Sequence, residues 1–452
     1  MSLRGHLLIY LVTVLACVRM LSQLFIPGKN WRLSLAELAS FLEARRIKFV
    51  VCSLSKEFFV VSVEEKVGAS IIDDLGGTIK IGDSVANFST EIVREAFLQK
   101  NKEAQSQIGR DTASSGLVGE TLKAESEKTV FGVSVYCAEK SLRPVSRNIQ
   151  RFIGSSIKRE LANYGRKSKF MGFSKDRKYP QLSHVEVLKK KLVENKAEAL
   201  FCIGKEQTWI STTIAVHNPF EFQKRDIGKP NQRKIFAMPP RLARIMINLA
   251  SCTSGKLLVD PFCGVGTILQ EALLAKAKVV GLDINPWCVE AARANLEWLK
   301  KEYELGETEY RVLQRDARRL APKIGQEAVD CVATEPDLGP ALRHVPTTPY
   351  AEKIIEKLEP LYNSFMEEAY KILKKDGRLV LVTPYVKTRS GNPVTMPIEE
   401  KAAKVGLKRV YPFQKEIFAK NIVAQQNLTE IASLVDAEER HKIGREIHIF
   451  RK

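Results

Sequence analysis

The sequence has no paired-cysteine motif. Its eight cysteines are scattered over 452 residues, with no C-x-x-C pair and no His/Cys cluster at zinc spacing. This excludes a structural zinc site and a disulfide framework, so we predict no bound metal and a reducing compartment, the cytoplasm.

Long apolar runs are also scarce. Residues 7–18 form one nearly unbroken apolar run between Arg4 and Arg19, but it is too short to span a bilayer comfortably. No small-residue cleavage site follows it, as a signal peptide would require. We interpret residues 1–20 as an apolar extension of unknown role, or as sequence upstream of a true start at Met20, and we do not expect a membrane anchor.

Acidic residues are in deficit. The chain has 71 Lys and Arg against 52 Asp and Glu, a net charge of +19, which favours a polyanionic partner. Residues 140–191 alone carry 15 basic and three acidic residues, interleaved with aromatics. A solvated basic face is the alternative, but this local excess favours nucleic acid. We expect phosphate contacts from Lys158, Arg159, Arg166, Lys167 and Lys169.

The chain divides into two small α+β units and a larger α/β unit. Residues 21–89 alternate short apolar runs with an amphipathic helix, for which Ser34 is the expected N-cap and Glu37 completes a capping box. Residues 90–225 form the second unit, with a polar, Ser/Lys/Glu-rich insertion over 99–128 that we expect to be mobile. A linker helix segment follows over 226–254.

From residue 255 to residue 452, strands alternate with helices. This pattern predicts a Rossmann-like, doubly wound parallel sheet, closed by a C-terminal antiparallel strand at or near its edge. The informative stretch is "LLVDPFCGVGTILQEA", in which a strand ends in Asp260, a loop contains Gly264 and Gly266, and Thr267 opens a helix. Glycines there let a ligand approach the backbone. The loop is not GxGxxG and lacks a phosphate-binding lysine, which argues against a nucleoside triphosphate.

Two further acids end the next strands. Asp283 is placed to bind ribose hydroxyls, and Asp316 to contact an adenine amino group. Three acids without a basic group for a pyrophosphate suit a cationic adenosine ligand, and S-adenosylmethionine fits because its amino group and sulfonium are positive. The alternative is that Asp260, Asp283 and Asp316 are ordinary helix N-caps.

Together, "DPFCGVGT", "GLDINPWCVEAARANL", "RDARRL" and "TEPDLGP" resemble motifs of the THUMP-domain tRNA guanine-N2-methyltransferases of archaea and eukaryotes. The resemblance implies a class I methyltransferase domain preceded by a ferredoxin-like N-terminal domain (21–89) and a THUMP domain (90–225). It also implies tRNA as partner and S-adenosylmethionine-dependent methylation of guanosine 10. It leaves open a small activating subunit and argues against DNA.

The family's Asp-Pro-Pro-Tyr-Gly motif aligns with residues 335–339. Glu335 and Pro336 would orient the guanine amine, with Asp337 assisting, whereas Leu338 replaces a base-stacking ring. Stacking would then fall to another ring; Tyr350, Tyr385 and Phe413 are available. The departures leave two alternatives open: a non-catalytic tRNA-binding protein with a degenerate site, and a methyltransferase acting on another RNA base.

Overall fold

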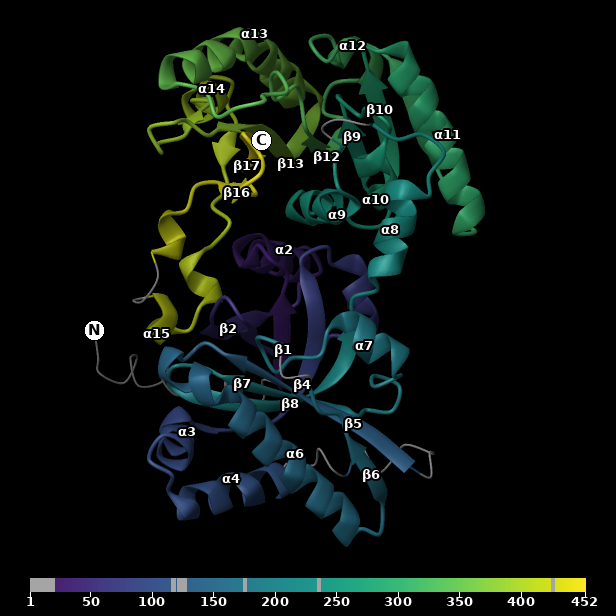
Figure 1. The fold of residues 1–452 in the computed structure, drawn as a ribbon. Helices are drawn as coiled ribbons and strands as arrows, with labels where there is room; N and C mark the ends of the chain where they lie inside the picture. Colours follow the sequence, from purple (N-terminus) through teal and green to yellow (C-terminus); the bar gives the residue numbers. More distant parts are fainter. Residues whose placement is uncertain (1–20, 115–118, 120–127, 174–176, 234–236, 424–426) are drawn as a thin grey trace, which may run out of the picture.

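A computed structural model describes residues 21–114, 119, 128–173, 177–233, 237–423 and 427–452. The chain folds into two lobes, each built around one β-sheet (Figure 1). The expectation for residues 1–20 and most of 115–127 falls outside the described residues. Within the described part, no helix is both long and apolar enough to cross a membrane.

The first lobe contains the following elements: β1 (Leu21–Pro27), α2 (Trp31–Ala44), β2 (Phe49–Leu54), β3 (Phe59–Val63), η1 (Ala69–Asp74), β4 (Thr78–Ser89), α3 (Thr90–Phe97), α4 (Lys102–Ser114), β5 (Lys128–Cys137), η2 (Lys140–Val145), α6 (Ser146–Asn163), β6 (Lys167–Phe170), α7 (His184–Lys189), β7 (Glu198–Ile203) and β8 (Gln207–Val216). Its strands lie in the order β2-β3-β1-β4-β8-β7-β5-β6.

The two α+β units predicted from the sequence share this one sheet. β1 and β2 both pair antiparallel with β3, which lies between them, so β1, α2 and β2 form a split β-α-β unit. β4 of the first unit then pairs antiparallel with β8 of the second. The boundary near residue 89 is therefore a turn between elements of one continuous sheet.

The prediction of a mobile insertion over residues 99–128 is wrong for the first half of that range. Residues 102–114 form helix α4, which packs against α6 beneath the sheet (Figure 1). Ala104, Ile108 and Thr112 are buried, and their spacing of four places them on one face of the helix. Polar composition hid this narrow apolar stripe.

The predicted cap of α2 is also wrong. The helix begins at Trp31, and Asn30 caps it by accepting a hydrogen bond from Leu33 N. Ser34 lies one turn inside and donates to Gly77 O at 2.8 Å. Glu37 accepts hydrogen bonds from Gly76 N and Gly77 N, both at 2.7 Å. Both side chains thus hold the turn before β4 against the helix, a contact distant in sequence.

The second lobe begins after β8 with these elements: α8 (Pro219–Ile227), α9 (Pro240–Leu249), β9 (Leu257–Asp260), α10 (Thr267–Leu274), β10 (Lys278–Asp283), α11 (Pro286–Glu302), β11 (Tyr310–Gln314), α12 (Ala321–Ile324), β12 (Val329–Thr334), α13 (Thr348–Ile372), β13 (Leu373–Val386), β14 (Val394–Thr395), α14 (Ile398–Lys404), β15 (Lys408–Arg409), η3 (Lys415–Ile417), α15 (Lys420–Val423), η4 (Leu428–Glu430), β16 (Leu434–Asp436) and β17 (Ile443–Arg451).

The main strands of this lobe lie in the order β11-β10-β9-β12-β13-β17-β15. Strands β9 to β13 are parallel, whereas β17 runs antiparallel beside β13. This confirms the doubly wound α/β sheet and its antiparallel C-terminal strand. The strand order reverses between β9 and β12, and ligands of such sheets bind at the carboxyl ends of the strands at this point.

The lobes share one hydrophobic core, which runs from Phe25 and Phe41 to Leu258 and Val332. α2 packs on α9 at the junction. The C-terminal segment carrying η3 and α15 descends beside β2, where Ala419 N donates to Val51 O at 3.1 Å (Figure 1). The lobes are therefore joined at α9 and also along the C-terminal segment.

Candidate active site

A cavity of about 380 Å³ lies at the carboxyl ends of the parallel strands. It is lined by Pro261, Phe262, Asp283, Ile284, Arg315, Asp316, Ala317, Arg318, Asp337 and Leu361. The structure thus brings together three predicted site residues, Asp283, Asp316 and Asp337, that are up to 54 positions apart in sequence.

The loop after β9 has the backbone that its glycines require. Gly264 has φ +51° and Gly266 has φ +85°, both in the left-handed region that side chains disfavour. A Cβ on Gly266 would lie 3.2 Å from the Cβ of Ala292 in α11. Asn295 of α11 also donates to Val265 O at 2.8 Å. The loop therefore packs closely against α11, which holds it in place.

Asp283 supports this loop from the neighbouring strand. Its carboxylate accepts hydrogen bonds from Gly264 N at 2.9 Å and from Asn285 N at 2.8 Å. It lines the cavity as well. Asp316 also lines the cavity, and its carboxylate is paired with Arg318, whose side chain lowers the pKa of Asp316. Ribose and adenine binding by these two acids stays a prediction.

Asp260 is buried at the end of β9, behind the cavity. Its Oδ1 accepts hydrogen bonds from Thr334 Oγ1 at 2.6 Å and Phe262 N at 3.2 Å. Burial raises the pKa of Asp260 to about 7, although those two hydrogen bonds oppose the rise. Asp260 therefore takes up a proton near neutral pH unless a positive charge is placed beside it.

Thr267 is buried too, and its partner was not predicted from the sequence. Lys229 Nζ donates to Thr267 Oγ1 at 2.9 Å, and both side chains are buried. Burial lowers the pKa of Lys229. The connecting chain before α9 thus places a cation at the start of α10. A Lys-Pro pair in charged connecting chain is only a weak signal for this residue.

The turn after β12 carries the altered motif. Gly339 has φ +100°, and a Cβ there would lie 2.8 Å from Ile354, which explains why a glycine ends the motif. Gly339 N donates to Asp337 Oδ1 at 3.0 Å, and Tyr362 donates to Asp337 O at 3.0 Å. Pro336 is buried, whereas Asp337 is exposed to the cavity. The turn is thus fixed by one hydrogen bond within the motif and by another from α13.

Glu335 does not line the cavity. Its carboxylate is paired with Arg445 of β17, which donates through Nε to Oε2 and through Nη2 to Oε1. The side chains of Glu335 and Arg445 are 12% and 10% exposed. Sequence reasoning missed Arg445, although a lone arginine among the alternating apolar residues of "IGREIHIF" is a signal of a buried charge.

A second cavity, of about 430 Å³, lies on the other side of this turn. It is lined by Ala237, Leu338, Pro340, Ala341, Leu342, Arg440, His441, Lys442, Ile443 and Arg445. None of Tyr350, Tyr385 and Phe413, the rings considered as replacements for the missing aromatic, is in this lining; Phe413 is buried in the core. His441 supplies the only ring among the described lining residues other than proline.

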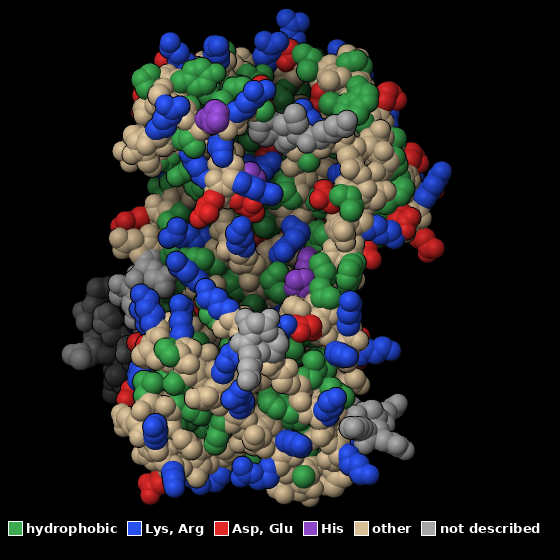
Figure 2. Space-filling model, viewed as in Figure 1, with side chains coloured by type: hydrophobic (Ala, Val, Ile, Leu, Met, Phe, Trp, Pro, Cys, Tyr) green, Lys and Arg blue, Asp and Glu red, His purple; other side chains and the backbone are tan. Residues whose placement is uncertain are grey.

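The predicted phosphate contacts lie on the first lobe. Lys158 and Arg159 are exposed on α6, and Lys167 and Lys169 are exposed at alternate positions of the edge strand β6, beside half-buried Arg166. Figure 2 shows further Lys and Arg side chains over this lobe and along the waist between the lobes. Four of the five predicted residues are therefore exposed on the first lobe.

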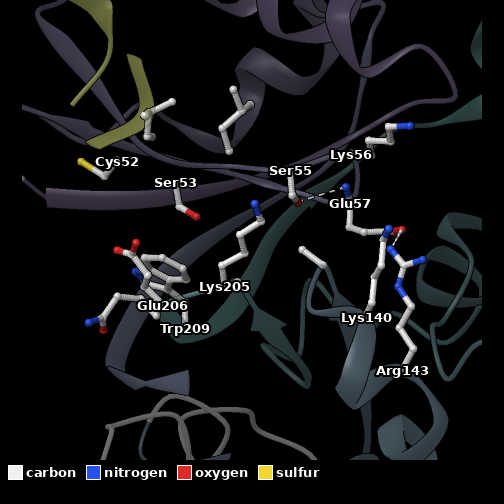
Figure 3. A pocket seen from close by; sticks show the side chains of 15 residues that line it. Cys52, Ser53, Ser55, Lys56, Glu57, Lys140, Arg143, Lys205, Glu206 and Trp209 are labelled. Atoms are coloured by element: carbon white, nitrogen blue, oxygen red, sulfur yellow. Dashed lines mark hydrogen bonds and ion pairs between the residues drawn. The ribbon is translucent and has the colours of Figure 1, made fainter. Parts of the chain in front are cut away.

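Part of that surface is a cavity of about 390 Å³ among three turns of the first lobe. Lys205 and Trp209 come from the β7–β8 hairpin, Lys56 from the β2–β3 turn, and Lys140 and Arg143 from η2 (Figure 3). Arg143 pairs with Glu57 at 3.4 Å. Within the described residues, Lys56, Lys140 and Lys205 form no ion pair. Glu206 also lines the cavity, which therefore has more basic than acidic side chains beside an indole ring.

Parts of this chain are similar to known protein families. Residues 230–406 match a family described as an RMKL-like methyltransferase domain (UPF0020), and residues 123–294 match a family described as a DNA methylase. Over 161 residues the chain is 36% identical to the tRNA (guanine(10)-N2)-dimethyltransferase of Methanothermobacter thermautotrophicus, a match covering 35% of this chain and 43% of the relative. It is 32% identical to the enzyme of the same name from Pyrococcus abyssi over 176 residues, covering 39% and 47%.

The matches thus span under half the length of these curated relatives. Among solved structures, TrmN from Thermus thermophilus is similar with a TM-score of 0.49 and 16% identity, over 96% of this chain and 99% of that one. The chain is therefore similar in sequence to tRNA guanine-N2-methyltransferases, and the segment that matches the RMKL-like methyltransferase domain includes the glycine loop and the motif.

Proposed function

We propose that this protein is an S-adenosylmethionine-dependent methyltransferase that modifies the N2 amine of guanosine in tRNA, at position 10. The observation that carries the proposal is the single cavity lined by Asp283, Asp316 and Asp337 at the strand ends. It joins the predicted cofactor residues to the motif that would orient the amine. The names of the curated relatives support the choice of tRNA and of guanosine 10.

The residues present fit a cationic adenosine cofactor. Gly264 and Gly266 allow the left-handed backbone of the loop, Asp283 and Asp316 line the cavity, and Thr267 opens the following helix. The buried Asp260, with its pKa near 7, would be stabilised as a carboxylate by a neighbouring positive charge. When bound, S-adenosylmethionine supplies an electrophilic methyl group.

The motif residues would prepare the amine. The lone pair of a guanine amine is delocalised into the ring, so acceptors placed for its two hydrogens localise it and fix its direction. Glu335 offers its carboxylate and Pro336 its backbone carbonyl, while Asp337 lies at the cavity wall as a further acceptor. Leu338 provides an apolar wall on the other side of the turn, where the base would lie.

The first lobe would bind the RNA. We assign residues 21–89 to a ferredoxin-like domain and residues 90–225 to a THUMP-like domain, which together form one sheet. Phosphates would contact Lys158, Arg159, Arg166, Lys167 and Lys169, and also the unpaired lysines of the cavity beside Trp209. The protein would act in the cytoplasm, with or without a small activating subunit.

The test is methyl transfer from labelled S-adenosylmethionine to an unmodified tRNA transcript, with the Glu335→Gln variant beside the wild type. The proposal predicts incorporation by the wild type, its loss in E335Q, and equal tRNA affinity of both. Wild-type protein that binds tRNA but transfers no methyl group, even with cell lysate added as a source of an activating subunit, would be a non-catalytic tRNA-binding protein.

A further inference from the structure

Arg445 and Glu335 meet across an intervening strand. Glu335 follows β12 and Arg445 lies in β17, and β13 runs between these strands. Pro384 of β13 is the residue opposite Arg445 in the ladder. The arginine side chain therefore extends over β13 to reach the carboxylate, and it reaches both oxygens. A two-point contact of this kind fixes the plane of the carboxylate as well as its position.

The surroundings of Glu335 make a cation necessary there. Asp260 of β9 and Asp337 of the motif turn are nearby acids, and Tyr362 of α13 lies near Glu335 and Asp337. Among the described residues, Arg445 is the cation paired with Glu335. Burial alone would lower the pKa of Arg445, but the attraction of Glu335 and Asp436 raises it. The guanidinium therefore stays charged beside this cluster of acids.

The pair leaves acceptor capacity for a substrate. A carboxylate has about four lone-pair positions, and Arg445 occupies two of them. Arg445 Nη2 also donates to Ala237 O at 3.3 Å, which anchors the guanidinium itself. Arg445 and Leu338 line the same cavity. A buried arginine held at two points beside a cavity is suited to orienting a neighbouring group, because little movement remains to it.

We infer that Arg445 is a positioning residue for methyl transfer: it holds the Glu335 carboxylate in one orientation, as an ionised acceptor for the substrate amine. The inference rests on the proposed function. Arg445 lies outside the segment that matches the RMKL-like methyltransferase family, residues 230–406, so it is a feature of this chain's C-terminal strand.

The experiment compares Arg445→Lys and Arg445→Met with the wild type in steady-state methylation of a tRNA transcript over a range of pH. R445K keeps the charge but loses the planar fork, so kcat should fall about 10-fold with KM for tRNA and the pH profile unchanged. R445M loses both, so kcat should fall about 100-fold, as misplacement by about 1 Å can cause. The pH profile of R445M should also change, because the substitution removes a positive charge from beside the acids of this site. Added guanidinium ion should partly restore the kcat of R445M.

Arg378→Met is the matched control, since Arg378 is another largely buried arginine of the same sheet that pairs with Glu43 at the lobe junction. It should leave the pH profile unchanged even if it lowers the melting temperature. R445K and R445M with wild-type kcat and pH profile would overturn the inference while the proposed function stands. A wild type without methyl transfer would overturn the proposed function, and this inference with it.

Discussion

Asn248 of α9 donates a hydrogen bond of 2.8 Å to the carboxylate of Glu37 in α2, so a polar contact joins the two lobes inside their shared core. Glu37 has no exposed surface, and burial raises its pKa to about 7. Hydrogen bonds from Gly76, Asn248 and Gly77 oppose this rise without cancelling it. A buried carboxyl group is therefore part of the junction between the two lobes.

The first prediction concerns stability and pH. A carboxyl group whose folded pKa exceeds its unfolded value stabilises the fold below the unfolded pKa, and this stabilisation is lost as pH rises through the folded pKa. For Glu37 that window runs from 4.5 to about 7. The free energy of unfolding of the wild type, relative to that of Glu37→Gln, should therefore fall by about 2 kcal/mol from pH 5 to pH 8.

Urea denaturation at the two pH values measures this difference. Glu64→Gln is the control, because Glu64 is 55% exposed and pairs only with Lys48 at the surface. Its difference from wild type should not depend on pH. If the free energy of unfolding of the wild type relative to E37Q stays constant or rises with pH, Glu37 is ionised in the fold.

The second prediction concerns the loop after β9. Gly266→Ala places a side chain at φ +85° and within 3.2 Å of Ala292, which displaces the loop from α11. Gly255→Ala imposes a similar left-handed strain, φ +79°, but its Cβ meets no atom within 4 Å. Each costs about 1 to 2 kcal/mol of stability. Calorimetry should show that the affinity for S-adenosylmethionine falls at least 10-fold in G266A only. An equal loss of affinity in both variants would show that the loop is not part of the binding site.

The third prediction concerns the edge strand β6. Lys167→Ala and Lys169→Ala together should weaken tRNA binding and lower the slope of log K against log salt concentration by about two, roughly one for each lost phosphate contact. Fluorescence anisotropy at several salt concentrations measures this slope. Lys301→Ala, an exposed lysine in α11 of the other lobe, is the control. An unchanged slope in the double variant would place the RNA elsewhere.

The fourth prediction concerns the basic cavity beside Trp209. Lys56, Lys140 and Lys205 line this cavity of about 390 Å³ and form no ion pair in the described part of the chain, so removing their charges should not destabilise the fold. We expect the triple alanine variant to keep or raise the melting temperature while binding tRNA more weakly. A lower melting temperature would mean that these lysines stabilise the fold. Unchanged affinity would exclude the cavity from the RNA interface.

The fifth prediction concerns the missing aromatic. Leu338 lines the cavity beside the motif, and a ring there could stack on a base, an interaction worth about 1 to 3 kcal/mol. Leu338→Phe should therefore lower KM for tRNA about 10-fold. Leu342→Phe adds the same ring to another wall of that cavity as a control. Equal effects of the two substitutions, or a higher KM for L338F alone, would argue against a base at Leu338.

Local patterns predicted much of this molecule. The alternation of strands and helices after residue 255 identified the doubly wound sheet, and "VDPFCGVGT" located the glycine loop, because both signals reside in contiguous residues. Topology then placed Asp283, Asp316 and Asp337 on one cavity. Contacts between distant segments were missed: the α2 cap, where Glu37 serves the lobe junction, and Arg445, which crosses a strand to reach Glu335. Helix α4 was missed because its apolar stripe is narrow.

The most direct measurement is mass spectrometry of an unmodified tRNA transcript after incubation with the wild-type protein and S-adenosylmethionine. The account predicts N2-methylated guanosine at position 10 and at no other position, made by a Glu-Pro-Asp-Leu motif. A methyl group on another nucleoside would contradict the assigned target. The absence of any new methyl group on a tRNA that the protein demonstrably binds would contradict the catalytic role of Glu335.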